Sequence, residues 1–310
     1  MPQVVTITLN PAVDVSTTAP QIEPARKLRC GPVRRDPGGG GINVARVIRR
    51  LGGEVLAIFP AGGPVGALLE RLVAAEHLPS VAVPIAGDTR EDFTVVETAT
   101  GREFRFVLPG PKLSAQEWQA CLRATLRNKS EVLVASGGLA PGAPDDFHAQ
   151  LARRAKADGA KLALDCSGPA LKAALEAGVW LVKPNLRELE DYAGWPLQSE
   201  AHRIATARSI VLSGGAKIVA LTLGEEGALL VTEHRAWRAS ALPIRRVSSV
   251  GAGDSFMGGL VWALSEGRNM EEAFRWAMAT GSAALLSPGT ELAHAADVKR
   301  LLPLVRVESV

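Results

Sequence analysis

Apolar runs of five or six residues alternate with amphipathic helical patterns through most of this 310-residue chain. Six runs predict buried strands, each followed by a helix or a loop, at residues 4–9, 55–60, 131–136, 161–165, 180–184 and 218–223. Strands that are apolar on both faces and separated by helices are typical of a parallel sheet covered on both sides. The alternation therefore predicts an α/β fold with a mostly parallel central sheet flanked by helices, and residues 251–302 predict three helices.

Two stretches interrupt this alternation. Residues 12–36 are irregular and extended, and residues 91–108 alternate as two strands about a turn at 99–102, which predicts a β-hairpin. The chain has no internal repeat, low-complexity tract or long linker. We therefore expect a single domain over residues 1–310, with lid segments at about 12–36 and 88–108 that form a small β-sheet.

The composition disfavours several classes of protein. With 47% hydrophobic and 22% charged residues and a net charge of +3, nothing indicates binding to nucleic acid or to a membrane surface. Cys30, Cys121 and Cys166 lie far apart without CxxC spacing, which disfavours a disulfide framework or a structural zinc site. The N-terminus lacks the pattern of a signal peptide, and the apolar stretches are too short to span a bilayer. These features predict a soluble, cytoplasmic protein.

The strongest chemical signal is GAGD, residues 251–254, where a helix is expected to begin. Gly251, Ala252 and Gly253 are small, so the backbone N–H groups there can face an anion, which the helix dipole also favours. Asp254 follows in the first turn, where a carboxylate can simply cap the helix. Alternatively, it accepts the proton of an attacking hydroxyl while the N–H groups hold a transferring phosphoryl group. The motif alone leaves both interpretations open.

Three further motifs place glycines or polar groups next to predicted elements. Four glycines at 38–41 lead into an amphipathic helix with Asn43 in its first turn, which indicates either a flexible turn or a close backbone approach to a ligand. A Walker loop is excluded, because no Gly-Lys-Ser/Thr follows. Residues 182–189 gather charge at the carboxyl end of a strand, where α/β sheets bind ligands, although a solvated loop explains them equally well. Residues 221–231 predict a strand, a glycine-bounded turn and a second strand.

Taken together, these motifs resemble a known family. GGGGINVAR and GAGD, in this order, resemble the two signatures of the ribokinase-like PfkB carbohydrate kinases. TLNPAVD, SGGLAPG, LDCSG, KPNLREL and TLGEEGA match further landmarks of that family in order, so the resemblance covers essentially the whole chain. It implies a ribokinase-like fold, namely a large α/β domain with a small β-sheet lid.

Within the family, APQIEPARKLRC at 19–30 and PGGGGINVAR at 37–46 are most similar to the minor bacterial 6-phosphofructokinases. This similarity implies ATP-dependent phosphorylation of fructose 6-phosphate at its 1-hydroxyl, which gives fructose 1,6-bisphosphate. Asp254 would be the general base, and the N–H groups around Gly251, Ala252 and Gly253 would form the anion hole for the transferring group.

The resemblance also implies binding residues. The sugar phosphate would be bound by Asp14, Lys27, Gly39, Gly40, Asn43, Arg90 and Arg105, of which the cations suit its phosphate. ATP would be bound by Lys183, Asn185, Arg187, Thr222, Gly224, Gly227, Ser248, Gly251, Gly253 and Ser282. Asn185 and Glu188 would organise Mg²⁺ through water, because this ion dehydrates reluctantly. A K⁺ site of some family members matches Ser248, Val250, Ala284, Ser287, Gly289 and Glu291.

A homodimer through the lid sheets is also implied, because exposed sheet edges would be covered in it. Two departures concern the choice of sugar: Glu23 stands where relatives carry tyrosine near the sugar phosphate, and Gly138 stands where serine is usual. They leave open a kinase of tagatose 6-phosphate or fructose 1-phosphate. Such enzymes usually carry a GGKG motif, however, and this chain has Gly40 at the position of its lysine. Arg90 and Lys27 disfavour a kinase of an unphosphorylated sugar or nucleoside.

Two hypotheses from other classes complete the alternatives. A non-catalytic sugar-phosphate sensor built on a kinase fold is disfavoured, because Asp254, the glycines and Glu188 are all present. A dinucleotide-binding oxidoreductase is excluded, because no GxGxxG follows the first strand with an acidic residue about twenty positions further on.

Overall fold

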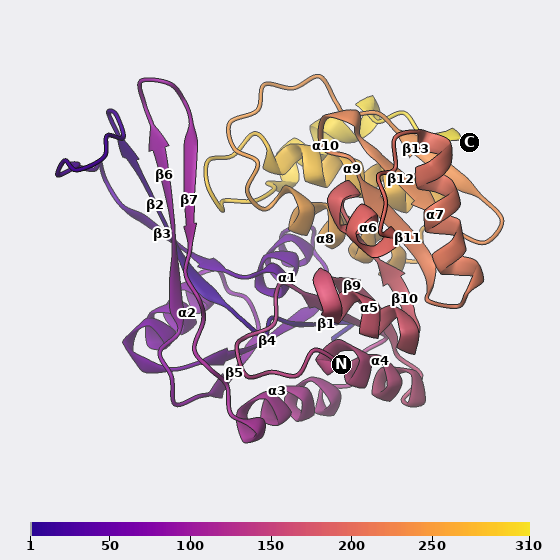
Figure 1. Ribbon diagram of the computed structural model, residues 1–310, viewed down its shortest axis with the longest axis horizontal. Helices are drawn as coiled ribbons and strands as arrows, with labels where there is room; N and C mark the ends of the chain where they lie inside the picture. The colour runs from indigo at the N-terminus through magenta and orange to yellow at the C-terminus, as the bar shows by residue number, and fades with distance from the viewer. Residues whose placement is uncertain (1) are drawn as a thin grey trace.

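The computed structural model describes residues 2–310, which form a ten-stranded sheet covered by helices and a separate four-stranded sheet (Figure 1). The strands of the large sheet are β1 (Val4–Ile7), β4 (Val55–Ala61), β5 (Ser80–Pro84), β8 (Val132–Ser136), β9 (Lys161–Asp165), β10 (Val179–Val182), β11 (Ala216–Thr222), β12 (Ala228–Val231), β13 (Ala236–Ala239) and β14 (Glu308–Ser309). Their spatial order is β14-β13-β12-β11-β10-β9-β8-β1-β4-β5. Neighbours from β5 to β11 are parallel, and β12 to β14 extend the sheet in antiparallel fashion. The predicted α/β fold class is confirmed.

The helices connect these strands and lie on both faces of the sheet. They are α1 (Gly40–Arg50), α2 (Gly63–Ala75), α3 (Ala115–Arg127), α4 (Phe147–Ala157), α5 (Gly168–Ala177), α6 (Leu186–Ala193), α7 (Glu200–Leu212), α8 (Ala252–Ser265), α9 (Met270–Ala284) and α10 (Ala295–Leu301). The six predicted strands correspond to β1, β4, β8, β9, β10 and β11, and the three predicted C-terminal helices are α8, α9 and α10.

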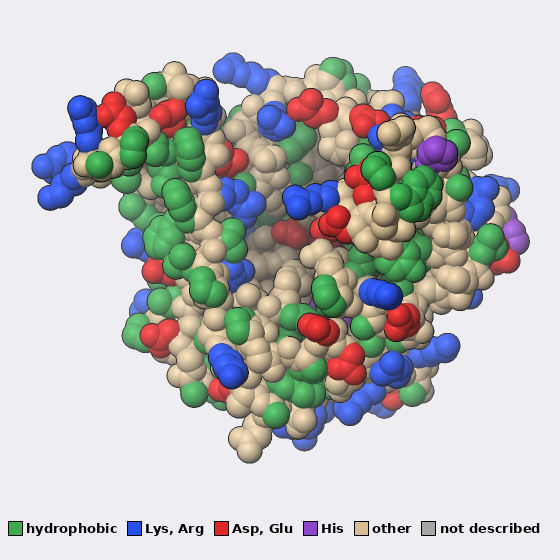
Figure 2. All heavy atoms as spheres, in the orientation of Figure 1, with side chains coloured by type: hydrophobic (Ala, Val, Ile, Leu, Met, Phe, Trp, Pro, Cys, Tyr) green, Lys and Arg blue, Asp and Glu red, His purple; other side chains and the backbone are tan. Residues whose placement is uncertain are grey.

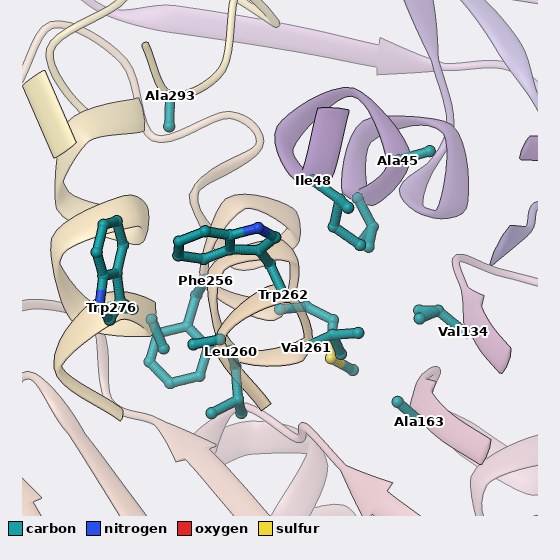
Figure 3. Close-up of a cluster of buried hydrophobic side chains, with 14 of the residues drawn as sticks. Ala45, Ile48, Val134, Ala163, Phe256, Leu260, Val261, Trp262, Trp276 and Ala293 are labelled. Carbon is teal, nitrogen blue, oxygen red and sulfur yellow. The ribbon is translucent and has the colours of Figure 1, made fainter. Parts of the chain in front are cut away.

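The hydrophobic core is divided between the two faces of the large sheet. Successive residues of β1 point to opposite faces, so Val4 joins a cluster with α1, α8 and α9, while Val5 joins a second cluster with α3, α4 and α5. This division explains why the strands are apolar along both faces. In the first cluster, Trp262 and Trp276 pack edge to face with ring centroids 4.6 Å apart (Figure 3). Along residues 2–310, no helix combines the length and apolar character that crossing a bilayer requires.

The small sheet extends from one side of the large sheet, at the left of Figure 1, with the order β3-β2-β6-β7. Its strands are β2 (Ala12–Ala19), β3 (Arg34–Gly38), β6 (Arg90–Glu97) and β7 (Glu103–Val107). β6 and β7 form the predicted antiparallel hairpin, and β2 and β3 arise from the stretch expected to be extended. Arg34 pairs with Glu291 at 3.1 Å and thereby ties the small sheet to the loop that precedes α10. Its action as a lid stays a prediction.

Candidate active site

A cavity of about 320 Å³, called here the sugar-side cavity, lies between the small sheet and the carboxyl ends of β8 and β9. Figure 2 shows a central hollow beside the small sheet, with acidic and basic side chains in and around it. Ten residues predicted for catalysis or binding line this cavity: Asp14, Gly39, Gly40, Asn43, Arg90, Arg105, Glu188, Val250, Gly251 and Asp254. Segments that are far apart in the sequence therefore meet at one site.

Asp254 lies in the first turn of α8 and lines the sugar-side cavity. Asn43 Nδ2 donates to Asp254 Oδ2 at 2.9 Å, and Ser136 Oγ lies 3.5 Å from Oδ1. Within residues 2–310, no side chain caps the start of α8, so the contacts do not support the helix-cap interpretation. Burial, and then the charge of Asp165, raises the pKa of Asp254 to about 6, while Asn43 and Lys183 oppose this rise. Such a carboxylate is ionised at neutral pH and can accept a proton from a hydroxyl.

Close contacts explain the glycines around Asp254. Gly251, the N-cap of α8, has a φ of 72°, and a Cβ there would lie 2.3 Å from Leu292 Cδ2. A Cβ on Gly40 would lie 2.3 Å from Ser136 Oγ, because the start of α1 packs directly against the end of β8. The run of four glycines is therefore an ordered close approach that brings α1 beside the site, and not a flexible turn.

The charged groups of the sugar-side cavity shift the pKa of Asp14 and decide which arginine keeps free hydrogen-bond donors. Burial, followed by the charge of Asp92, raises the pKa of Asp14 to about 7, and Arg105 opposes this rise. Arg90 is already engaged, since it donates to Asp92 at 3.0 Å and to the Leu108 carbonyl oxygen at 2.9 Å. Arg105 also lines the cavity, and within residues 2–310 its guanidinium makes no hydrogen bond or ion pair. Arg105 is thus the cation with donors available for a phosphate.

A second cavity of about 590 Å³, called here the nucleotide-side cavity, meets the first at the start of α8. Ala252 and Gly253 line this cavity, whereas Gly251 and Asp254 line the other. The predicted residues Asn185, Thr222, Gly224, Gly227 and Ser282 also line the nucleotide-side cavity. Much of its remaining wall is apolar and was missed by the sequence analysis: Ala228, Ala241, Leu242, Pro243, Ile244, Phe256, Met278 and Leu285. A mostly apolar slot with a few polar groups suits a nucleotide base.

Lys183 follows β10 and is buried beside the start of α8. Its Nζ lies 3.1 Å from Asp165 Oδ1, and a Cβ on Gly253 would lie only 3.4 Å from the same nitrogen. Burial acts to lower the pKa of Lys183, but the ion pair with Asp165 outweighs it and holds the pKa above its ordinary value. The side chain therefore supplies a fixed positive charge next to the N–H groups of α8, without lining either cavity.

Three other predicted binding residues lie outside both cavities. Lys27 is exposed on the connection between β2 and β3, and Arg187 is exposed on α6. Ser248 is buried, and its hydroxyl donates to Glu103 of β7 at 3.1 Å. Its neighbour Ser249 lines the nucleotide-side cavity instead. Direct ligand contacts of Lys27, Arg187 and the Ser248 hydroxyl are therefore not supported by the geometry of one chain.

The model of the pfkB family of carbohydrate kinases matches residues 2–296. The chain belongs to this family. It is 42% identical over 306 residues to the ATP-dependent 6-phosphofructokinase isozyme 2 of Mycobacterium tuberculosis, covering 98% of this chain and 90% of the relative. It is 34% identical to the 1-phosphofructokinase of Xanthomonas campestris, covering 99% of this chain and 92% of the relative. The crystal structure of phosphofructokinase-2 from Escherichia coli in complex with fructose-6-phosphate matches with a TM-score of 0.93 and 39% identity, covering 98% of this chain and 99% of that chain.

The predicted PfkB membership and ribokinase-like fold are thus confirmed. Several residues that line the sugar-side cavity of this family member were missed by the sequence analysis: Asp92, Val107, Ser136, Gly137, Asp165, Cys166, Ser167 and Thr290. Asp165 carried a usable signal, because it ends a predicted buried strand at the edge where α/β sheets bind ligands. Asp92 carried none, because a single acid in a hairpin is usually solvated.

Asn185 and Glu188 are the residues of this site that were predicted to organise Mg²⁺. Across residues 2–310, no three acidic, histidine or cysteine side chains converge as a self-contained metal site. Glu188 lines the sugar-side cavity and accepts from the Asn185 N–H at 2.9 Å. Burial raises the pKa of Glu188, and the Asn185 N–H opposes that rise. One or two carboxylates acting together with water and nucleotide phosphates are the usual Mg²⁺ environment in kinases, and these residues fit it.

The residues matched to the K⁺ site belong to two segments that the structure brings together. The Val247 N–H donates to the Leu285 carbonyl at 2.8 Å, which joins the loop before α8 to the end of α9. Arg50 donates to the Glu291 carbonyl oxygen, and Arg34 pairs with the Glu291 carboxylate at 3.1 Å. Two guanidinium groups therefore already engage one of the matched residues, and K⁺ binding stays a prediction.

Proposed function

We propose that this chain transfers the γ-phosphoryl group of ATP to the 1-hydroxyl of fructose 6-phosphate, giving fructose 1,6-bisphosphate and ADP. The start of α8 carries the proposal: Asp254 lines the sugar-side cavity, and Ala252 and Gly253 line the nucleotide-side cavity. A hydroxyl held in the first cavity and a terminal phosphoryl group held in the second would meet there. The free N–H groups and the dipole of the helix favour the negative charge of the transferring group.

In this transfer, the substrate hydroxyl oxygen forms a bond to the γ-phosphorus as the bond to the β–γ bridging oxygen breaks. Asp254 accepts the hydroxyl proton, which its pKa of about 6 permits at neutral pH. The buried ammonium group of Lys183 adds positive charge beside Gly253. Asn185 and Glu188 would hold Mg²⁺ through water, and the metal supplies charge neutralisation at the phosphates when it is bound.

The sugar-side cavity supports a phosphorylated acceptor. Arg105 offers free donors to a phosphate, and Arg90 lies close enough to add charge from the neighbouring strand. Charge-assisted contacts of this kind contribute about 1.5–3 kcal/mol each, which discriminates against a sugar without the phosphate. Asp14 would accept hydrogen bonds from sugar hydroxyls. Lys27 lies outside this cavity in its own chain, so its role stays a prediction, as does the homodimer through the small sheets.

The test is ATP consumption by the purified protein with Mg²⁺ and a panel of acceptors. The panel holds fructose 6-phosphate, tagatose 6-phosphate, fructose 1-phosphate, fructose, ribose and adenosine. Highest kcat/KM with fructose 6-phosphate supports the proposal. Preference for another phosphorylated sugar keeps the mechanism and overturns the substrate, and preference for fructose, ribose or adenosine overturns the role given to the arginines.

A fructose-1-phosphate or tagatose-6-phosphate kinase is the second candidate, because a 1-phosphofructokinase is 34% identical to this chain. Gly40 favours fructose 6-phosphate, since a side chain there would lie 2.3 Å from Ser136 Oγ and 2.9 Å from the Gly137 nitrogen. The lysine that the alternative enzymes usually carry at this position therefore does not fit this backbone. Gly138 has open space around it and sets no such limit.

A non-catalytic sensor would bind a sugar phosphate tightly and turn over none of the panel. Such a sensor would need only the sugar-side cavity. The nucleotide-side cavity, which meets it at the start of α8 beside Asp254, would then have no function. The cytoplasmic location that we propose is supported by the free state of Cys30, Cys121 and Cys166, as expected of a reducing compartment.

A further inference from the structure

Arg46 of α1 is a fully buried cation close to the site. Its Nη1 donates to the carbonyl oxygens of Pro37 and Thr290, both at 3.0 Å, and lies 3.3 Å from Asn43 Oδ1. Pro37 belongs to β3 of the small sheet, and Thr290 belongs to the loop before α10. Figure 1 shows α1 in the middle of the molecule, where it contacts both α8 and β3. One guanidinium group thus joins α1 to the base of the small sheet and to this loop.

Glu76, the C-cap residue of α2, supplies the countercharge for Arg46. One carboxylate oxygen accepts from Arg46 Nη2, and the other accepts from Arg50 Nη2 at 3.0 Å. Burial acts to raise the pKa of Glu76, but the two arginines outweigh it and hold the pKa below its ordinary value. A buried guanidinium without a partner is strongly destabilising, so Glu76 fixes where the Arg46 side chain lies.

The position of Arg46 decides which way the Asn43 amide points. The two residues are three apart on α1 and share one face of the helix. A guanidinium can only donate, so the carbonyl oxygen of the amide must face Arg46 and the NH₂ group must face away. In that orientation Asn43 Nδ2 reaches Asp254 Oδ2 at 2.9 Å. The reversed amide would place two donors together at Arg46 and two acceptors together at Asp254.

We infer that Glu76 and Arg46 are positioning residues for phosphoryl transfer, acting through Asn43 to hold the carboxylate of Asp254. The inference rests on the proposed function, but neither residue lines the sugar-side or the nucleotide-side cavity. The chain of contacts runs from the end of α2 through α1 to the start of α8. The same arginine holds the Pro37 carbonyl, so the base of the small sheet and the general base share one anchor.

The test measures the pKa of Asp254 directly, by carbon-13 NMR of protein labelled at aspartate, with the signal assigned from Asp254→Asn. In Glu76→Gln the Arg46 anchor weakens, Asn43 donates less well, and the pKa of Asp254 rises by about one unit. The other groups that face Asp254 are Asp165 from β9, Lys183 from β10 and Ser136 from β8, and none is altered.

Arg50→Gln is the matched control, because it removes the other ion pair of Glu76 but has no contact with Asn43. It should leave the pKa of Asp254 unchanged. Where Glu76→Gln fails to fold, Glu76→Asp keeps the charge and shortens the side chain, and a smaller rise is expected. A purely structural role would lower stability in all three variants and move the pKa in none, which would overturn the inference.

A double-mutant cycle of Glu76→Gln with Asn43→Ala tests whether Glu76 affects Asp254 through Asn43. If Glu76 acts through Asn43, the pKa of Asp254 in the double variant equals that of Asn43→Ala alone. Additive rises would show a different route and overturn the inference. Turnover gives a separate readout: kcat with fructose 6-phosphate should fall about tenfold in Glu76→Gln, with KM nearly unchanged. A wild-type protein without turnover would refute the proposed function, while the NMR titration would still decide this inference.

Discussion

Replacing Asp254 by asparagine separates the chemistry of the site from the stability of the fold. The side chain keeps its size, and an amide oxygen can still accept the hydrogen bond that Asn43 donates at 2.9 Å. An amide cannot take up the hydroxyl proton, however, and general-base catalysis contributes about 10²–10⁴-fold to a rate. We therefore expect Asp254→Asn to lower kcat about a thousandfold. The affinity for ATP should change little, because ATP is assigned to the other cavity.

The same substitution should stabilise the protein at working pH. The pKa of Asp254 is raised from 3.8 to about 6, so its contribution to stability is present below pH 3.8 and is lost as the pH rises through 6. A difference of about two pH units corresponds to about 3 kcal/mol of unfolding free energy. Partial solvent exposure and the weaker hydrogen bonds of a neutral amide reduce the expected gain at pH 8 to about 1–2 kcal/mol.

Urea unfolding of the wild type and of Asp254→Asn at pH 4.5 and pH 8 measures this difference, and a coupled ATPase assay measures turnover. The stability gain should be clear at pH 8 and should shrink as the pH falls toward 4.5. Equal destabilisation at both pH values would indicate that Asp254 serves the helix and not the reaction. Turnover within a factor of about ten of the wild type would refute its assignment as the base.

Three further predictions follow from the charges of the site. Arg105→Gln should lower kcat/KM for fructose 6-phosphate about tenfold to a hundredfold, because it removes charge-assisted hydrogen bonds to the phosphate. Any slow turnover of unphosphorylated fructose should stay unchanged, and an equal loss with both sugars would contradict a phosphate contact. Lys183→Met should lower the free energy of unfolding by about 2–3 kcal/mol, because it leaves the half-buried carboxylate of Asp165 without its partner. Urea unfolding tests this, and an unchanged stability would show that the ion pair contributes nothing. Finally, kcat/KM should fall as the pH drops below about 7 and then 6, because Asp14 and Asp254 must both be ionised, and a rate profile that is flat from pH 5 to 8 would exclude this requirement.

The sequence was informative wherever a local pattern has a single structural outcome. Both faces of β1 are buried, because Val4 and Val5 belong to different clusters, which is what the mostly apolar run at 4–9 predicted. The roles of individual charged residues could not be obtained in this way. The sequence assigned both Arg90 and Arg105 to the sugar phosphate. Only the contacts of Arg90 with Asp92 and Leu108 show which of the two arginines keeps free hydrogen-bond donors. Such contacts depend on strand register and on the third dimension, which no local pattern specifies.

The sequence of α8 shows how one helix meets the demands of both the core and the site. Gly258 and Gly259 lie in its middle, where each glycine is about 1 kcal/mol less favourable than alanine. A Cβ on Gly258 would lie 2.8 Å from Val47 Cγ1, and one on Gly259 would lie 2.5 Å from Thr280 Oγ1, so α8 packs tightly against α1 and α9. That close approach brings the first turn of α8 within hydrogen-bond distance of α1, where Asn43 meets Asp254. The glycines in the core therefore serve the site at the helix start, because a wider spacing of the two helices would break the contact that orients the base.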